Sequence, residues 1–122
     1  MATMTRSNPI VERCIEDCLQ CLRWCSACID EGLTYDPARM AECIRLCREC
    51  SPVCAACTIL LSGNSRFAHQ LCGVCADICD ACADECGKYG DMETMRKCSE
   101  ACRRCAKSCR EVAKSGPIRK VA

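Results

Sequence analysis

Residues 14–28 read CIEDCLQCLRWCSAC, and this stretch decides the fold because five of its fifteen residues are cysteine. Successive cysteines are separated by steps of four, three, four and three residues. An α-helix turns once in about 3.6 residues, so these steps place every side chain on one narrow stripe. The stretch therefore predicts a helix with a column of thiols along one face.

Three further segments repeat this spacing, and the four runs together contain all 19 cysteines of the chain. In a helical bundle, a stripe that averages 3.5 residues per repeat faces the partner helices. Thiols therefore take the positions that Leu, Ile and Val usually occupy. The runs are Cys14, Cys18, Cys21, Cys25 and Cys28; Cys43, Cys47, Cys50, Cys54 and Cys57; Cys72, Cys75, Cys79, Cys82 and Cys86; and Cys98, Cys102, Cys105 and Cys109.

Helix-start signals open each of the four segments. Asn8-Pro9 and Asp36-Pro37 pair an N-cap residue with a proline at the first helical position. Asn64-Ser65 and Asp91 are the expected caps of the third and fourth helices, and Gly32 is the expected stop of the first. We expect helices at about residues 9–31, 37–62, 65–87 and 91–114.

Short connections join the expected helices, and short links force neighbouring helices to run antiparallel. Pro52 removes a backbone hydrogen bond inside the second segment, but the cysteines stay in phase across it, which indicates a bend and not a break. The sequence therefore predicts an all-α protein with a single domain over residues 1–122. Its architecture is an antiparallel up-down-up-down four-helix bundle with cysteines lining the core.

The composition argues against nucleic-acid and membrane partners. The chain has 17 Lys and Arg against 16 Asp and Glu, and it has only one Phe, one Trp and two Tyr. It lacks both the basic charge and the aromatic platforms that nucleic-acid binding uses. No stretch approaches the ~18 apolar residues of a membrane span, and residues 1–13 lack the apolar run of a signal peptide. We therefore expect a cytoplasmic protein, in which thiols stay reduced and are more often metal ligands than disulfides.

Soft thiolates select Cu(I), Zn(II) and iron–sulfur clusters, and charge helps to choose among them. If each ion takes two thiolates and each thiolate bridges two ions, about one monovalent ion per cysteine leaves a neutral core. Tetrahedral zinc with four thiolates would leave a buried negative excess, which is costly without nearby cations. The stripes carry no Lys or Arg. The sequence therefore favours multiple Cu(I) ions, about one per cysteine.

The repeated CxxxCxxC units, such as Cys14-Cys18-Cys21 and Cys43-Cys47-Cys50, resemble those of the bacterial cytosolic copper storage proteins. The resemblance covers nearly the whole chain, from about residue 9 to residue 114. It implies a four-helix bundle that fills with Cu(I) through inward-facing cysteines, stores copper in the cytosol and assembles as a homotetramer.

Two methionines extend the cysteine stripes at one end of the expected bundle. Met40 lies three residues before Cys43, and Met95 lies three residues before Cys98. A thioether is a soft, neutral ligand for Cu(I). The two side chains are therefore candidate copper ligands, and the alternative is that they close the core by packing alone.

His69 lies three residues before Cys72, at the opposite end of the expected bundle. A single histidine is more often a surface or capping residue than a ligand. Because the resembling family uses an end-of-bundle histidine beside its cysteines, His69 is also a candidate copper ligand. The sequence does not choose which end admits the ion.

Two other functions remain open at this point. The first is a zinc or cadmium buffer like metallothionein, on the same scaffold. The second is a thiol redox sensor that binds no metal. The sequence holds no paired carboxylates, no Ser/His/Asp set and no glycine-rich phosphate loop, so we do not expect an enzyme.

Overall fold

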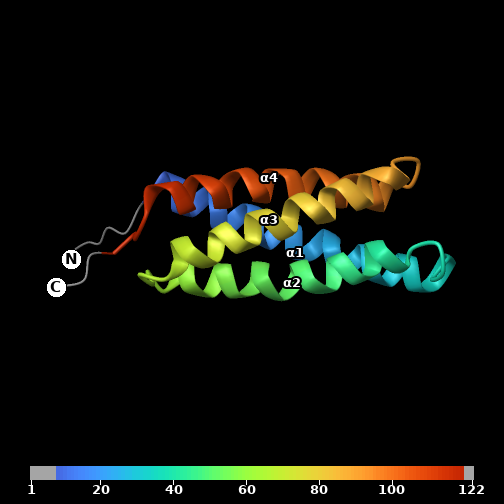
Figure 1. Cartoon of the computed structure of the whole chain (residues 1–122), viewed down its shortest axis with the longest axis horizontal. Helices are drawn as coiled ribbons and strands as arrows, with labels where there is room; N and C mark the ends of the chain where they lie inside the picture. Colours follow the sequence, from blue (N-terminus) through green and yellow to red (C-terminus); the bar gives the residue numbers. More distant parts are fainter. Residues whose placement is uncertain (1–7, 120–122) are drawn as a thin grey trace.

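Four long helices form an antiparallel bundle in the computed structural model, which describes residues 8–119 (Figure 1). The expected all-α bundle is therefore confirmed. Helices α1 and α3 each pack against both α2 and α4, so the four helices surround a central axis. The elements are α1 Pro9–Tyr35, α2 Ala41–Ser62, α3 Ala68–Cys86, the short 3-10 helix η1 Gly87–Tyr89 and α4 Glu93–Ser115.

The first helix starts as expected but ends later. The side-chain oxygen of Asn8 accepts hydrogen bonds from the backbone N–H groups of Ile10, at 3.0 Å, and Val11, at 3.4 Å. The predicted stop at Gly32 is wrong, because α1 continues to Tyr35. Gly32 is buried, and a Cβ at this position would lie 3.0 Å from Cγ1 of Ile44. The glycine therefore allows the start of α2 to approach α1 closely, and it does not end the helix.

The second helix starts four residues later than expected, at Ala41. The Asp36 side chain accepts a hydrogen bond from the N–H of Arg39 at 3.2 Å, so it stabilises the turn that precedes the helix. Pro52 lies inside α2 without interrupting it, as the phase of the cysteines predicted.

The third and fourth helices also start late, at Ala68 and Glu93. Asn64 takes a φ of 57°, and Ser65 accepts a hydrogen bond from the N–H of Phe67, so both residues belong to the preceding turn. Asp91 does not cap α4, which follows Met92 directly. The Ser65 side chain therefore stabilises the connection between α2 and α3 and not the first turn of α3.

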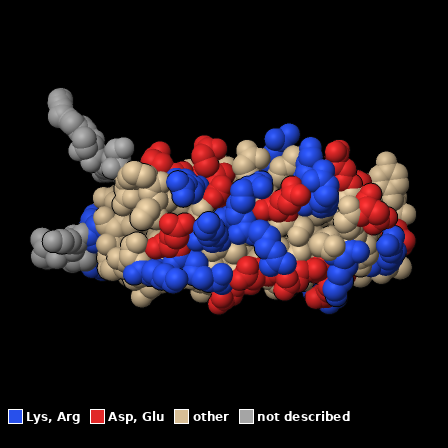
Figure 2. Space-filling view, turned by 90° about the horizontal axis from the view of Figure 1, so that it is seen from above, with Lys and Arg blue, Asp and Glu red and all other residues tan. Residues whose placement is uncertain are grey.

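Charged side chains lie on the outside of the bundle, where Lys and Arg alternate with Asp and Glu (Figure 2). Arg110 on α4, for example, contacts Asp77 and Asp80 on α3 at 3.2 and 2.9 Å. No Lys, Arg, Asp or Glu is buried within residues 8–119. Over the same residues, no helix is both long and apolar enough to cross a bilayer. Within these residues, the cysteine thiols are therefore the ionisable groups that fill the core.

Candidate metal centre

The core of the bundle is a column of sulfur atoms. All 19 cysteines are free thiols, and none is more than 1% exposed. The predicted inward orientation of the four stripes is therefore confirmed. Ser108 is the one buried polar residue of the part of the chain described, and it hydrogen-bonds to Asp17 across the α1–α4 contact.

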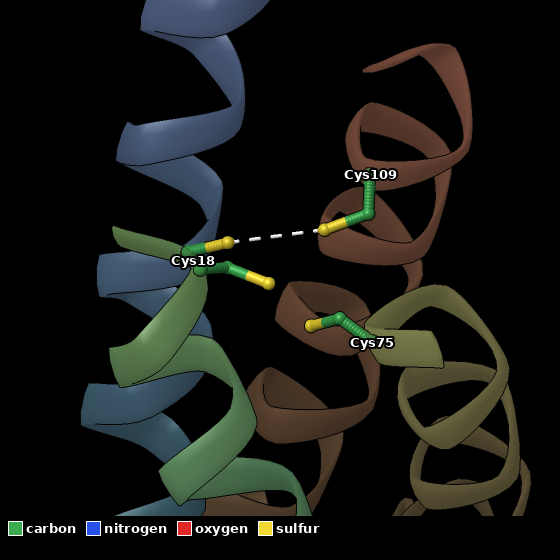
Figure 3. A group of neighbouring side chains, drawn as sticks. Cys18, Cys75 and Cys109 are labelled. Carbon is green, nitrogen blue, oxygen red and sulfur yellow. Dashed lines mark hydrogen bonds between the residues drawn. The ribbon is translucent and has the colours of Figure 1, made fainter. Parts of the chain in front are cut away.

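The sulfur atoms of different helices lie close enough to share metal ions. The Sγ atom of Cys21 lies 3.5 Å from those of Cys50 on α2 and Cys102 on α4. Figure 3 shows Cys18, Cys75 and Cys109, from α1, α3 and α4, pointing into the same space, with 3.8 Å between the sulfurs of Cys18 and Cys109. A disulfide requires about 2.05 Å, whereas two sulfurs on one metal lie roughly 3.5–4.5 Å apart. The spacing fits a metal-bridged core.

Groups of four sulfurs, each within 4.8 Å of one another, follow one another along the bundle. Three groups in the middle of the column share members, because Cys21, Cys25 and Cys102 each belong to two groups. A shared thiolate bridges two ions, which is the arrangement that the charge argument for monovalent copper requires. The groups include Cys18–Cys57–Cys75–Cys109, Cys21–Cys54–Cys79–Cys105, Cys21–Cys25–Cys50–Cys102, Cys25–Cys82–Cys98–Cys102 and Cys28–Cys43–Cys47–Cys86.

The thiols also shift one another's pKa values before metal binds. A hydrogen bond with Cys109, followed by contacts with further cysteines and by burial, raises the pKa of Cys105. Hydrogen bonds from Cys43, Cys47 and Cys86 lower the pKa of Cys28, and a hydrogen bond from Cys102 is the largest influence that lowers the pKa of Cys98 to about 7. The core therefore holds thiols of two kinds: those whose pKa is raised, such as Cys105, stay neutral longest, and those that accept several hydrogen bonds, such as Cys28, ionise first.

The two candidate methionines lie at the same end of the bundle, as predicted. Met40 and Met95 are 1% and 0% exposed. The Sδ atom of Met95 lies 2.8 Å from Sγ of Cys28, which is itself 3.4 Å from Sγ of Cys43. The thioether of Met95 therefore adjoins the last group of four thiols.

His69 lies in the first turn of α3, at the other end, and is partly buried. Its Nδ1 atom is buried and has no hydrogen-bond partner among the described residues. A buried imidazole nitrogen without a partner is unusual, because most such atoms are satisfied. The Nδ1 nitrogen of His69 is therefore available as a metal ligand near the end of the cysteine column.

Spacing within the sequence did not predict one contact between the two connections at the end of the bundle where Met40 and Met95 lie (the methionine end). The hydroxyl of Tyr89 donates a hydrogen bond to the backbone carbonyl of Arg39 at 3.0 Å. The guanidinium of Arg39 also lies over the ring of Tyr89, 5.0 Å from its centre. The two residues belong to different interhelical connections and are 50 positions apart, so no local pattern could have paired them.

Comparisons with known proteins support the interpretation of this core as a copper-binding site. A family model described as "Copper storage protein" matches residues 7–114. The Cu(I)-bound copper storage protein BsCsp3 is 39% identical, with a TM-score of 0.81 over 85% of this chain and 98% of that chain. A cytosolic copper storage protein from Streptomyces lividans, loaded with five coppers, is 37% identical, with a TM-score of 0.81 over 86% of this chain and 92% of that one.

A curated relative, the uncharacterized cysteine-rich protein YhjQ of Bacillus subtilis (strain 168), is 40% identical over 68 residues. This alignment spans 55% of the present chain and 63% of the relative, so it covers less than two thirds of that protein. The family model, in contrast, covers nearly the whole cysteine-lined bundle. The chain belongs to the copper storage protein family.

Proposed function

We propose that the whole chain, residues 1–122, is a single domain that stores and sequesters many Cu(I) ions in the cytoplasm. The observation that carries this proposal is the column of buried sulfurs, in which the middle groups of four share Cys21, Cys25 and Cys102. Copper is the cargo of this protein and not a catalytic cofactor. A cytosolic role agrees with the description of the Streptomyces lividans relative.

The proposed ligands are the 19 core cysteines, at about one ion per cysteine, because this ratio neutralises the thiolates. Met40 and Met95 are the proposed thioether ligands at one end, supported by the contact of Met95 with Cys28. His69 is the proposed imidazole ligand at the other end, supported by its unpartnered Nδ1.

Zinc or cadmium fits the same core less well. A divalent ion with four thiolates leaves two negative charges, and no buried Lys or Arg within residues 8–119 would balance them. Copper with bridging thiolates needs no such compensation. The shared cysteines also favour ions that share ligands over separate tetrahedral sites.

The empty core should fold without metal, because neutral thiols pack as small apolar groups. Circular dichroism of the reduced, copper-free protein should therefore show nearly the full helicity of the loaded form. A protein that gains most of its helix on metal binding would contradict this preformed core.

Titration of the reduced protein with Cu(I), in anaerobic competition with a coloured chelator, tests the function. Storage predicts uptake of about one ion per cysteine before the chelator gains colour. A plateau at about four to seven ions, with zinc bound in preference, would instead support tetrahedral sites. Absence of uptake, with thiols lost on mild oxidation, would support a redox sensor.

We also propose that copies of this chain associate, as the homotetramer of the resembling family implies. Ile59 on α2, Phe67 just before α3 and Val74 on α3 are 70%, 53% and 52% exposed. Phe67 and Val74 line a shallow groove with Leu60 and Leu71. Light scattering should show Val74→Asp shifted to a smaller species, whereas Leu33→Asp, at the other end of the bundle, should keep the wild-type mass. An unchanged mass for Val74→Asp would contradict this interface.

A further inference from the structure

Three cysteines from three different helices form a compact trio in the sulfur column. The Sγ atom of Cys28 on α1 lies 3.4 Å from that of Cys43 on α2 and 3.8 Å from that of Cys86 on α3. The Sγ atoms of Cys43 and Cys86 are 3.0 Å apart. Every sulfur of the trio can therefore contact one small atom placed among them.

The separations within this trio fit an atom that binds three sulfurs in a pyramid. With bonds to sulfur of about 2.3 Å, a pyramid with angles of about 95° places the sulfurs roughly 3.4 Å apart, whereas planar three-coordinate and linear ions require roughly 4.0 and 4.6 Å. A trio in the middle of the column, Cys21, Cys50 and Cys79, is wider, with separations of 3.5, 3.6 and 3.9 Å. This second trio fits a pyramidal atom less closely.

Trivalent arsenic binds three sulfurs with this geometry, because its lone pair occupies the fourth position. It is soft, and soft ions prefer thiolate ligands. Three thiolates on a trivalent atom form a neutral complex, so the complex needs no buried cation, and residues 8–119 contain no buried Lys or Arg. The neutrality that favours monovalent copper over zinc in this core therefore also admits a trivalent atom bound by three cysteines.

We propose that Cys28, Cys43 and Cys86 form a site for one trivalent arsenic atom, which the protein takes up as uncharged arsenous acid. Each of the three As–O bonds is replaced by an As–S bond, and each thiol proton leaves with a hydroxide as water. Arsenic stays trivalent, and three thiols and one arsenous acid yield one neutral complex and three waters. The three cysteines are at most 1% exposed, so the complex is shielded from the water that would reverse the reaction.

Arsenic at this trio excludes copper from the same sulfurs. At one copper ion per cysteine, three cysteines held by arsenic lower the copper capacity by about three ions. The site itself does not depend on copper storage, because it requires only the three thiols and their spacing. The same chain would then sequester a second toxic element whenever its core is empty.

Titration of the reduced, copper-free protein with arsenite tests the site. A phosphine keeps the thiols reduced, because a dithiol reductant would itself bind arsenic. The first equivalent should remove three free thiols, and native mass spectrometry should show one arsenic atom gained and three hydrogens lost. X-ray absorption should show three sulfurs at one distance from arsenic. Protein that holds one arsenic atom should take up about three fewer Cu(I) ions than the arsenic-free protein.

Cys28→Ser and Cys79→Ser form a matched pair, because each removes one fully buried cysteine of the column. Cys28→Ser should weaken binding of the first arsenic atom roughly 100-fold or more, since a third ligand held in place binds as an intramolecular one. Cys79→Ser alters the wider trio and should keep the wild-type arsenic affinity.

Equal arsenic affinities in the two variants would overturn the site, and so would binding through only two sulfurs or no binding by the wild-type protein. Tight arsenic binding by a protein that takes up no copper would support the site and overturn only the storage function.

Discussion

The two ends of the bundle close the same sulfur column in different ways. At the end where Met40 and Met95 lie, thioethers continue the stripe, and Tyr89 and Arg39 join the two connections between helices. At the opposite end, where His69 lies (the histidine end), aliphatic side chains close the core, and the His69 nitrogen is left unpartnered beneath the surface. The four cysteine runs continue from one end of the bundle to the other, so the two ends differ chiefly in the residues that close them.

The largest expected effect comes from replacing one group of four cysteines at each end. Substituting serine for all of Cys28, Cys43, Cys47 and Cys86 should lower copper capacity by about four ions and slow the first phase of uptake tenfold or more. The matched variant replaces the cysteines at 18, 57, 75 and 109 and should lose the same capacity while keeping the fast first phase. Stopped-flow transfer and copper analysis of each variant would measure both quantities. Equal slowing in the two variants would mean that the ends are equivalent.

Single substitutions at the two ends, Met95→Leu and Leu61→Met, test the same difference between the ends and disturb the fold less than four substitutions do. Met95→Leu keeps the volume of a buried side chain, so the copper-free protein should lose less than about 1.5 kcal/mol of unfolding free energy. Its copper uptake should nevertheless slow about three- to tenfold, because a soft ligand has been removed from the methionine end. Leu61→Met adds a thioether at the histidine end and should leave the rate unchanged. Faster uptake in Leu61→Met would show that copper also crosses that end.

The third prediction concerns the pH dependence of stability, which arises from the cysteine thiols because the methionine thioethers do not ionise. Hydrogen bonds to neighbouring cysteines, together with burial, raise the pKa of Cys25 and Cys105 in the folded protein. In the unfolded chain these thiols ionise at their ordinary pKa of about 8.5. The stability that thiols of this kind provide while neutral is therefore complete below about pH 8.5 and is lost as the pH rises further, whereas a thiol with a lowered pKa, such as Cys28, contributes in the opposite sense.

Thermal melts at pH 7, 8, 9 and 10 check this dependence. The melting temperature of the copper-free protein should fall above pH 8, whereas that of the loaded protein should not, because copper already holds the thiolates. Met95→Leu should follow the wild-type pH dependence. A copper-free protein whose melting temperature rises with pH would contradict the neutral core.

The smallest effect concerns the backbone near the methionine end. Gly32→Ala places a methyl group 3.0 Å from Ile44, so it should destabilise the copper-free protein by about 1–2 kcal/mol in urea unfolding. Gly73 is the control, since a methyl group there would meet its nearest neighbour, Ala113, at 3.8 Å. Because alanine favours helix over glycine, Gly73→Ala should stabilise the protein by about 0.5–1 kcal/mol. Stabilisation by both substitutions would show that α1 and α2 can separate freely at Gly32.

The sequence was sufficient for the bundle and for the orientation of its cysteines, because steps of three and four residues translate directly into one helix face. It was not sufficient for the helix ends. Gly32 carries the usual signal of a helix stop, yet its role depends on the approach of Ile44 from another helix. Asp36 has a typical capping side chain but serves a turn instead. The Tyr89–Arg39 contact joins distant connections, and only the assembled bundle brings them together.

The sharing of cysteines between neighbouring groups of four makes the length of the bundle a direct measure of what it can hold. Seven added residues per helix lengthen an α-helix by about 10.5 Å and, with this spacing, supply two more inward cysteines from each of the four helices. Such an insertion would enlarge the store by roughly eight ions without any new kind of site. The copper capacity of such a bundle can therefore be changed by adding or removing seven-residue repeats, with no change in the kind of site.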